Sequence, residues 1–181
     1  SSDVCSSDLA EAKIASFACL SGARELAASL QRKDVLLFDA KSDVFWISDN
    51  PVVMHNAFPY SGMGLDAPGV EIYFPLTPRY VLAFYCPSIV TKIEEVMSLD
   101  LPTEATLRYQ GIISGIRKGV PVDATEYVRF LNSLQVSYSS RFVYSSTPDF
   151  DLAKRLLKAN PDRKAVQSLF VVGGVGQALQ Y

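Results

Sequence analysis

The stretch Val44-Phe-Trp-Ile-Ser-Asp-Asn-Pro-Val-Val53 places a run of apolar residues directly before a polar turn, and apolar residues resume after it. Branched and aromatic residues such as those at 44–47 favour a buried strand, whereas Ser, Asp, Asn and Pro favour a turn. A buried strand that ends in an acid and an amide, here Asp49 and Asn50, is a common setting for a functional site. The same side chains also serve simply to hydrogen-bond the turn backbone, so both interpretations stand.

Working outward, the sequence predicts that Val35–Phe38 pairs with Val44–Ser48 as an antiparallel hairpin. Both segments are apolar on both faces, which predicts a sheet covered on two sides, with Trp46 buried on its central strand. Val70–Leu76 and Tyr80–Cys86 predict a second hairpin, whose prolines make its connection irregular.

Apolar residues recur with helical spacing in five further segments. We expect helices from Ala10 to Leu30, from Pro87 through Met97, from Leu101 to Lys118, from Thr125 to Ser139 and from Asp149 to Lys158. Gly111 and Gly115 lie four residues apart, a spacing that lets another element approach one helix face. A short strand is expected at Arg141–Ser145. This order of elements predicts an α+β domain, in which an antiparallel, hairpin-rich sheet packs against several helices.

Two segments lack regular periodicity. Val52–His55 is predicted to be a brief continuation of the strand interrupted at Pro51, and Asn56–Gly69 a loop anchored by its apolar residues. In the Gly-rich tail Ser168–Tyr181, the cluster Gly173-Gly174-Val175-Gly176 is not followed by the Lys-Ser/Thr pair of a phosphate loop, so we interpret it as a turn.

The first nine residues, Ser1–Leu9, correspond to the translation of a common sequencing adapter. We therefore expect residues 1–9 to be an artefact, and residues 10–181 to form one domain, the C-terminal part of a longer protein.

Composition limits the class of protein. The net charge is −2 and half of the residues are hydrophobic, so the chain lacks the basic footprint of a nucleic-acid-binding module. Its three cysteines show no metal-binding spacing, which favours reduced thiols in a cytoplasmic protein. No apolar run is long enough for a membrane span. The composition identifies no cofactor and no partner.

No complete catalytic signature is present. The nucleophile elbow and the His-Glu-x-x-His motif are both missing, and the one histidine, His55, follows the polar turn by a few residues. Asp49 is the candidate metal ligand, and Asp43, Asp66 and Glu71 are acids that could join it in a magnesium site.

Three separated blocks carry a resemblance to a known family. They are Phe45-Trp-Ile-Ser-Asp-Asn-Pro-Val-Val53, Glu71-Ile-Tyr-Phe-Pro-Leu-Thr-Pro78, and Asn132 followed by Ser140-Arg-Phe-Val-Tyr-Ser145. In this order they resemble the largely bacterial domain of unknown function (DUF) 4238. The family's upstream His-Tyr-Val-Pro-Gln-like segment is not in this chain, which agrees with the adapter interpretation. The resemblance implies a bacterial protein but no established activity.

Three functional hypotheses follow. In the first, Asp49, Asn50, Asn132 and Arg141 form a polar site for a phosphate-containing substrate, with Arg141 binding phosphate and Asp49 holding a metal or water. In the second, the chain is a non-catalytic binding or defence-accessory module that contacts its partner through the loop at 56–69. In the third, the polar residues form a structural network. Whether the protein is an enzyme stays open.

Overall fold

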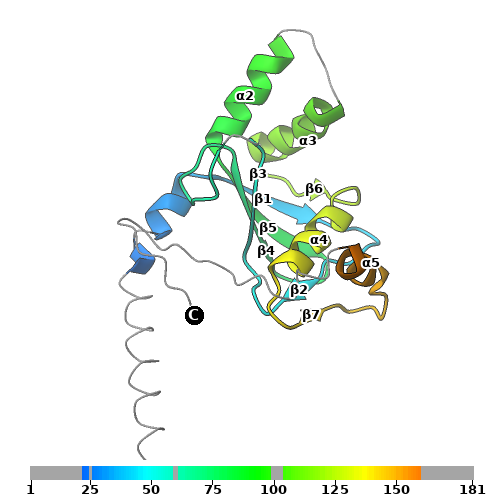
Figure 1. The fold of residues 1–181 in the computed structure, drawn as a ribbon. Coiled ribbons are helices and arrows are strands. Elements are labelled where there is room, and N and C mark those ends of the chain that lie inside the picture. Colours follow the sequence, from blue (N-terminus) through cyan, green and yellow to red (C-terminus); the bar gives the residue numbers. More distant parts are fainter. Residues whose placement is uncertain (1–21, 25, 59–60, 99–103, 160–181) are drawn as a thin grey trace, which may run out of the picture.

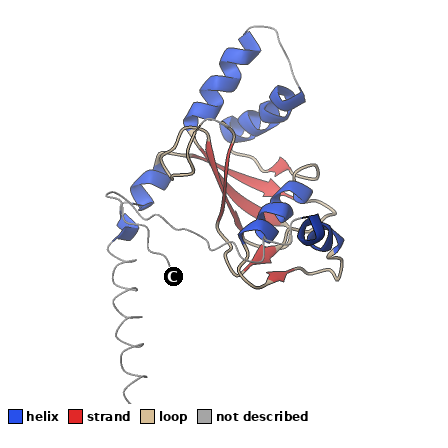
Figure 2. Cartoon of the chain, viewed as in Figure 1, coloured by secondary structure: helices blue, strands red, loops and turns tan. Residues whose placement is uncertain are grey.

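The computed structural model describes residues 22–24, 26–58, 61–98 and 104–159. The described part of the predicted first helix, residues 22–24 and 26–31, is helical, and the rest of that prediction lies outside these ranges, as do residues 1–9 and the tail at 168–181. Strands and helices then alternate in groups, with the helices gathered around a central sheet (Figures 1 and 2). The α+β expectation is confirmed.

The central sheet has five strands in the order β3-β4-β5-β1-β6. These are β1 (Asp34–Asp39), β3 (Val53–Asn56), β4 (Val70–Pro75), β5 (Tyr80–Tyr85) and β6 (Val122–Asp123). Neighbouring strands are antiparallel, except that β6 runs parallel to β1. The predicted β4–β5 hairpin is therefore confirmed, because its two apolar runs and the intervening turn are adjacent in sequence.

The predicted hairpin between Val35–Phe38 and Val44–Ser48 is wrong. β1 pairs instead with β5 over six residues and with β6, whereas β2 (Ile47–Ser48) pairs with β7 (Val143–Tyr144) in a separate two-stranded sheet. The connection after β1 passes over the β4–β5 turn, where the N–H of Ala40 donates to Arg79 O and that of Phe45 to Pro78 O. A six-residue ladder provides hydrogen-bond partners for more backbone groups than the short hairpin would, so β5, and not the segment at 44–48, pairs with β1.

Four helices complete the described part of the fold: α2 (Pro87–Ser98), α3 (Glu104–Lys118), α4 (Val128–Tyr138) and α5 (Asp151–Ala159). All four fall within or close to the segments predicted from periodicity. Among the described residues, no helix combines the length and the apolar character needed to cross a membrane.

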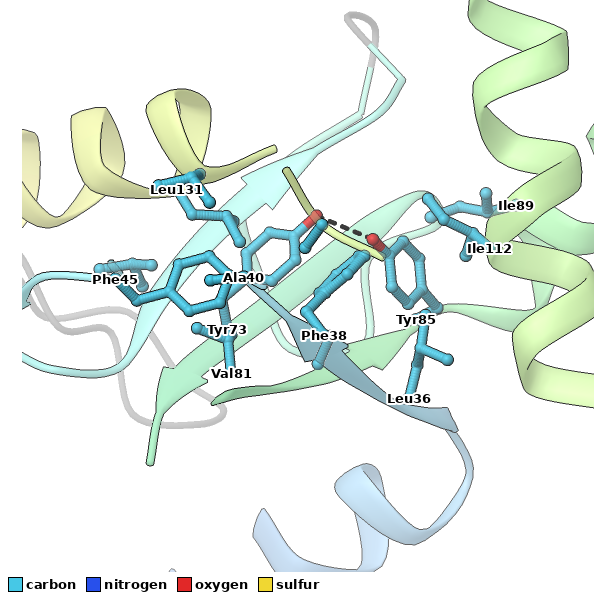
Figure 3. Close-up of a cluster of buried hydrophobic side chains, with 14 residues drawn as sticks. Leu36, Phe38, Ala40, Phe45, Tyr73, Val81, Tyr85, Ile89, Ile112 and Leu131 are labelled. Atoms are coloured by element: carbon cyan, nitrogen blue, oxygen red, sulfur yellow. Dashed lines mark hydrogen bonds between the residues drawn. The ribbon is translucent and has the colours of Figure 1, made fainter. Parts of the chain in front are cut away.

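The core lies between one face of the central sheet and helices α3 and α4 (Figure 3). Phe38 of β1 and Tyr73 of β4 meet Ile112 of α3 and Leu131 of α4 there. The opposite face is open at β1, where Val35 is 52% exposed, so the prediction of a sheet covered on both faces fails at that strand, whereas Ile72 of β4 on the same face is buried. A side chain that points away from the packed face alternates with one that points into it.

Trp46 is buried, as predicted, but it lies just before β2 of the small sheet and not on a central strand. Its ring packs against Phe150, 5.3 Å between centroids, in the segment that leads into α5. An aromatic contact therefore joins the segment that leads into β2 to the segment that leads into α5.

Candidate functional site

The four polar residues predicted to form a site lie along one line of contact between the segment around β2 and helix α4. Asp49 and Asn50 form the turn after β2, Asn132 lies within α4, and Arg141 lies in the turn that joins α4 to β7. Asp49 and Asn50 contact the residues around Arg141, whereas Asn132 contacts the chain before β2.

The Asp49 carboxylate closes the turn between α4 and β7. One oxygen accepts the N–H of Ser140 at 2.9 Å and the other accepts the N–H of Arg141 at 2.8 Å. The Asn50 amide donates to Tyr138 O and to Ser140 Oγ, both at 2.9 Å. These are the contacts of Asx residues that hold backbone in place, which is the bonding that the structural-network hypothesis describes.

Asn132 and Gln135 of α4 hydrogen-bond the backbone of the segment that contains β2. Asn132 Oδ1 accepts the N–H of Trp46 at 2.8 Å, and its Nδ2 donates to Val44 O at 3.0 Å. Gln135 Oε1 accepts the N–H of Ser48 at 2.9 Å, and its Nε2 donates to Pro51 O at 2.9 Å. Both amides are buried, and so are Trp46 and Ser48, whose N–H groups would be costly to bury without these partners.

Gln135 was not predicted from the sequence, although a signal was present. On a helix, residues three apart lie on the same side, so Gln135 shares the side of Asn132, and Tyr138 follows at the next such step. The Tyr138 hydroxyl donates to Met54 O of β3 at 2.7 Å. An amide or hydroxyl every third residue on a buried helix face indicates that the helix hydrogen-bonds neighbouring backbone.

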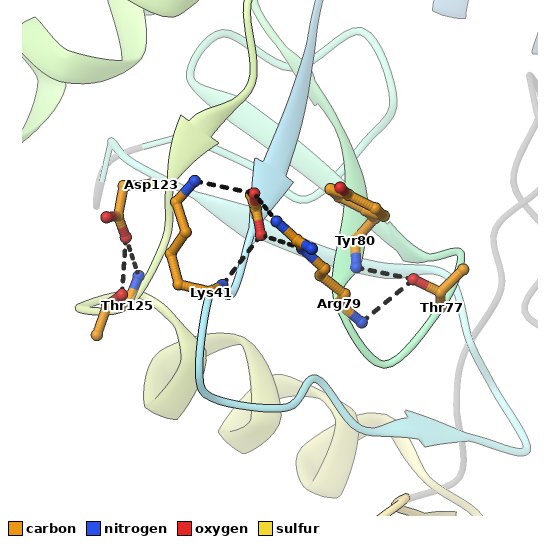
Figure 4. Close-up of polar contacts among 7 residues, drawn as sticks. Lys41, Thr77, Arg79, Tyr80, Asp123 and Thr125 are labelled. Carbon is orange, nitrogen blue, oxygen red and sulfur yellow. Dashed lines mark hydrogen bonds and ion pairs between the residues drawn. The ribbon is translucent and has the colours of Figure 1, made fainter.

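A second polar cluster surrounds Asp39 at the end of β1 (Figure 4). Its carboxylate accepts from Arg79 Nε at 2.8 Å and Nη2 at 3.0 Å, and from Lys41 Nζ and the Lys41 N–H at 3.0 Å each. These donors, the Arg79 guanidinium above all, hold the pKa of Asp39 well below its usual range. Lys41 has a positive φ of 57°. Asp39 stabilises this conformation by accepting hydrogen bonds from both the backbone N–H and the side-chain ammonium of Lys41. The cluster fixes the connection between the two sheets.

A buried carboxylate lies inside the core. The Glu71 side chain accepts the hydroxyl of Tyr73 at 2.8 Å and that of Tyr109 at 2.7 Å, and the Tyr73 and Tyr85 hydroxyls lie 3.1 Å apart. Burial raises the pKa of both Tyr73 and Tyr85 well above the usual value. The cavity beside this cluster measures about 20 Å³, enough for about one water molecule. It is therefore too small for a substrate.

His55 lies opposite Glu71 in the β3–β4 register and packs edge-on against Phe130, 5.1 Å between ring centroids. Its half-buried setting lowers the pKa of the imidazole. Asp66, another predicted acid, pairs with Arg32 at 2.9 Å. Within the described ranges, no group of three or more His, Cys, Asp or Glu side chains is arranged to hold a metal ion.

An apolar groove of about 340 Å³ lies between the small sheet and the β4–β5 turn. Its lining residues are all uncharged: Phe45, Ile47, Pro75, Leu76, Thr77, Pro78, Tyr144, Ser145 and Ser146. Leu76 is 50% exposed and Tyr144 55%, and Phe142, whose ring centroid lies 6.2 Å from that of Tyr144, is 56% exposed. The loop at 56–69 offers less apolar surface among its described residues, because Phe58 packs against the core and leaves Met63 as its exposed large apolar side chain.

The groove unites the three sequence blocks that carry the family resemblance. Phe45 and Ile47 come from the first block, residues 75–78 from the second, and Tyr144 and Ser145 from the third. No curated protein and no solved structure matches the chain. The sequence model of one family, described as a protein of unknown function (DUF4238), does match, over residues 3–149. The chain therefore belongs to the DUF4238 family.

Proposed function

We propose that this protein is a binding module that holds an apolar segment of a partner protein in the groove between the small sheet and the β4–β5 turn. The observation that carries this proposal is the convergence of all three sequence blocks on one groove whose lining is uncharged and whose Leu76 and Tyr144 side chains are about half exposed. Exposed apolar side chains gathered in a concave surface are typical of protein-interaction sites.

Selection from a displayed library of short random peptides tests this function. Wild-type protein should enrich peptides rich in apolar residues. Leu76→Ser should weaken the binding of an enriched peptide by about tenfold or more, because burying a Leu side chain contributes about 1.5–3 kcal/mol. Val120→Ser is the matched control, since Val120 is 47% exposed and lies outside the groove.

The result that contradicts the proposal is a selection in which wild type enriches no peptide, or in which the Leu76 and Val120 variants bind the enriched peptide equally. Circular dichroism and thermal melts of each variant show whether the protein is folded in the binding assay. Both substitutions change exposed side chains, so we expect both variants to fold.

The alternative function is chemistry on a phosphate-containing substrate at the Ser48–Pro51 turn. One observation favours it: Arg141 is exposed, and its guanidinium has no hydrogen bond or ion pair within the described residues. A guanidinium binds phosphate oxygens through paired N–H groups. In this version Asp49 holds a divalent metal ion or a water in addition to its two backbone contacts.

Thermal melts of wild type and Asp49→Asn, with and without magnesium or manganese, test the alternative. A metal site predicts that the ion raises the melting temperature of wild type but not of the variant. A purely structural Asp49 predicts no effect of the ion, and a loss of about 1–2 kcal/mol in Asp49→Asn, since an amide accepts one of the two N–H groups and turns its NH₂ toward the other.

A further inference from the structure

The small sheet has one backbone edge that is already satisfied. The side of the β2 segment that faces α4 presents Val44 O, Trp46 N and Ser48 N. The side-chain amides of Asn132 and Gln135 hydrogen-bond all three. The helix thus takes the place that a third strand would occupy beside β2. No further strand can pair with that side.

The outer edge of β7 is different. The N–H of Asp49 donates to Phe142 O, so these two residues form a hydrogen-bonded pair. Such pairs alternate with non-hydrogen-bonded pairs along an antiparallel ladder, so the backbone groups of the next pair, Ser48 and Val143, point away from each other. The N–H and C=O of Val143 therefore point outward from the sheet. Within the part of the chain that the structure describes, neither these groups nor the backbone N–H and C=O of Ser145 make a hydrogen bond.

We propose that the occupant of the groove is an extended peptide strand of a partner protein, which adds to the outer edge of β7 and carries an acidic residue next to Arg141. This inference rests on the proposed binding function. Main-chain hydrogen bonds to an open sheet edge, combined with alternate side chains that enter an apolar pocket, are a recurring mode of peptide recognition.

Charge complementarity selects the acidic residue. The nine groove-lining residues are uncharged, and Arg141, two residues before Val143, is an exposed cation whose side chain has no ion-pair partner among the described residues. Arg141 lies in the turn before β7, with its N–H bonded to Asp49, so it is not part of the ladder. A strand that pairs with β7 and continues past Val143 runs alongside this turn, which brings one of its side chains near the guanidinium. An acidic side chain there forms an exposed ion pair with Arg141, whereas a basic residue is disfavoured by like-charge repulsion.

The exposed side chains of β7 define the rest of the ligand. Tyr144 and Ile47 face each other in the register of the small sheet, and both line the groove. Alternate residues of the added strand then contact this surface, because successive side chains of a strand point to opposite faces. The ligand pattern is apolar at every second position, with an acid between.

The test uses peptides enriched on wild-type protein, resynthesised with a single N-methyl group at each backbone nitrogen in turn. Strand addition predicts that methylation at alternate residues weakens binding by about tenfold or more, whereas methylation of the intervening residues changes it by less than about twofold. The protein itself is unchanged in this experiment, so a folding defect cannot mimic the result.

Arg141→Glu tests the proposed charge pair, and Arg129→Glu on the exposed side of α4 is the matched control. Peptides with the acid replaced by Lys should gain about twofold to fivefold on Arg141→Glu relative to wild type, as expected for an exposed ion pair, and should not gain on the Arg129 variant.

Three outcomes overturn the inference. One is an enriched Pro-x-x-Pro peptide, which indicates a polyproline helix in the groove. Another is binding that is insensitive to N-methylation or to the Arg141 charge. The third is a concentration-dependent dimer of wild type that excludes the peptide, which assigns the edge to a second copy of the chain. In the first two outcomes, loss of binding in Leu76→Ser still supports the groove, whereas an absence of any enriched peptide rejects the binding function itself.

Discussion

Asn132 and Gln135 bond the backbone of a segment that has a partner strand on one side and a helix on the other. Between them, the two side chains contact four backbone positions from Val44 to Pro51. Side-chain amides carry both a donor and an acceptor, so one residue satisfies an N–H and a C=O together. The bonding matters because Trp46 and Ser48 are buried.

We expect Asn132→Ala to lower the free energy of unfolding by about 2–4 kcal/mol, because it leaves the Trp46 N–H and the Val44 C=O without their partner. Urea denaturation followed by circular dichroism measures the change. Arg129→Ala on the exposed side of the same helix should stay within about 0.5 kcal/mol of wild type. A loss below about 1 kcal/mol for Asn132→Ala would show that water replaces the amide.

Asp39 makes stability depend on pH. The pKa of Asp39 in the folded protein lies below its value in the unfolded chain, which is about 4. The Asp39 charge therefore stabilises the folded state above about pH 4, and this contribution is lost as the pH falls toward the folded pKa. Asp39→Asn should therefore be less stable than wild type at neutral pH, and the difference should shrink below about pH 4. Urea midpoints of both proteins over this range provide the measurement. A difference that stays constant at every pH contradicts the role of the Asp39 charge.

At the scale of elements, the approach of α3 to the sheet depends on one glycine. A Cβ at Gly115 would collide with Val122 of β6 and would come within 2.9 Å of Leu36 of β1. A Cβ at Gly111, one turn earlier, would meet nothing within 4 Å. The predicted close approach is thus confirmed at Gly115 and wrong at Gly111.

The two glycines give a matched pair of substitutions. Gly111→Ala should stabilise the protein by up to about 1 kcal/mol through helix propensity. Gly115→Ala gains the same propensity but forces α3 away from β1 and β6, so we expect a net loss of about 1–3 kcal/mol. Thermal and urea melts of both variants test this. Equal effects of the two substitutions would mean that the contact between α3 and the sheet adjusts freely.

At the scale of the whole molecule, α4 connects the two sheets. It bonds the segment around β2 through Asn132 and Gln135, and it bonds β3 of the central sheet through Tyr138. The small sheet buries few apolar residues of its own, and two-stranded sheets are marginal in isolation. We infer that it is stable only as part of one cooperative unit with the central sheet.

Trp46 reports on this unit, because it is the one tryptophan of the chain and packs beside the small sheet. Its fluorescence should be blue-shifted in the folded protein, and its transition in urea should coincide with the loss of far-ultraviolet circular dichroism. An earlier fluorescence transition would show that the small sheet opens before the central sheet.

The sequence by itself determined the features that depend on neighbouring residues. The β4–β5 hairpin, the helices α2 to α5 and the burial of Trp46 follow from apolar periodicity and turn residues, which act over short distances along the chain. The three blocks also identified the family. At the candidate site, the sequence selected Asp49, Asn50 and Asn132 as residues of interest, and hydrogen bonding of the turn backbone was one of the two roles left open for Asp49 and Asn50.

Tertiary structure alone decided which strands pair and which residues meet. A short apolar strand such as β1 fits many partners equally well, and β5 and β6 became its neighbours because together they fill both of its edges. The assembly of the groove from residues 45–47, 75–78 and 144–146, and the burial of Glu71 among tyrosines, required the same long-range choice. Periodicity reports which face of an element is buried, but it carries no information on the element that covers it.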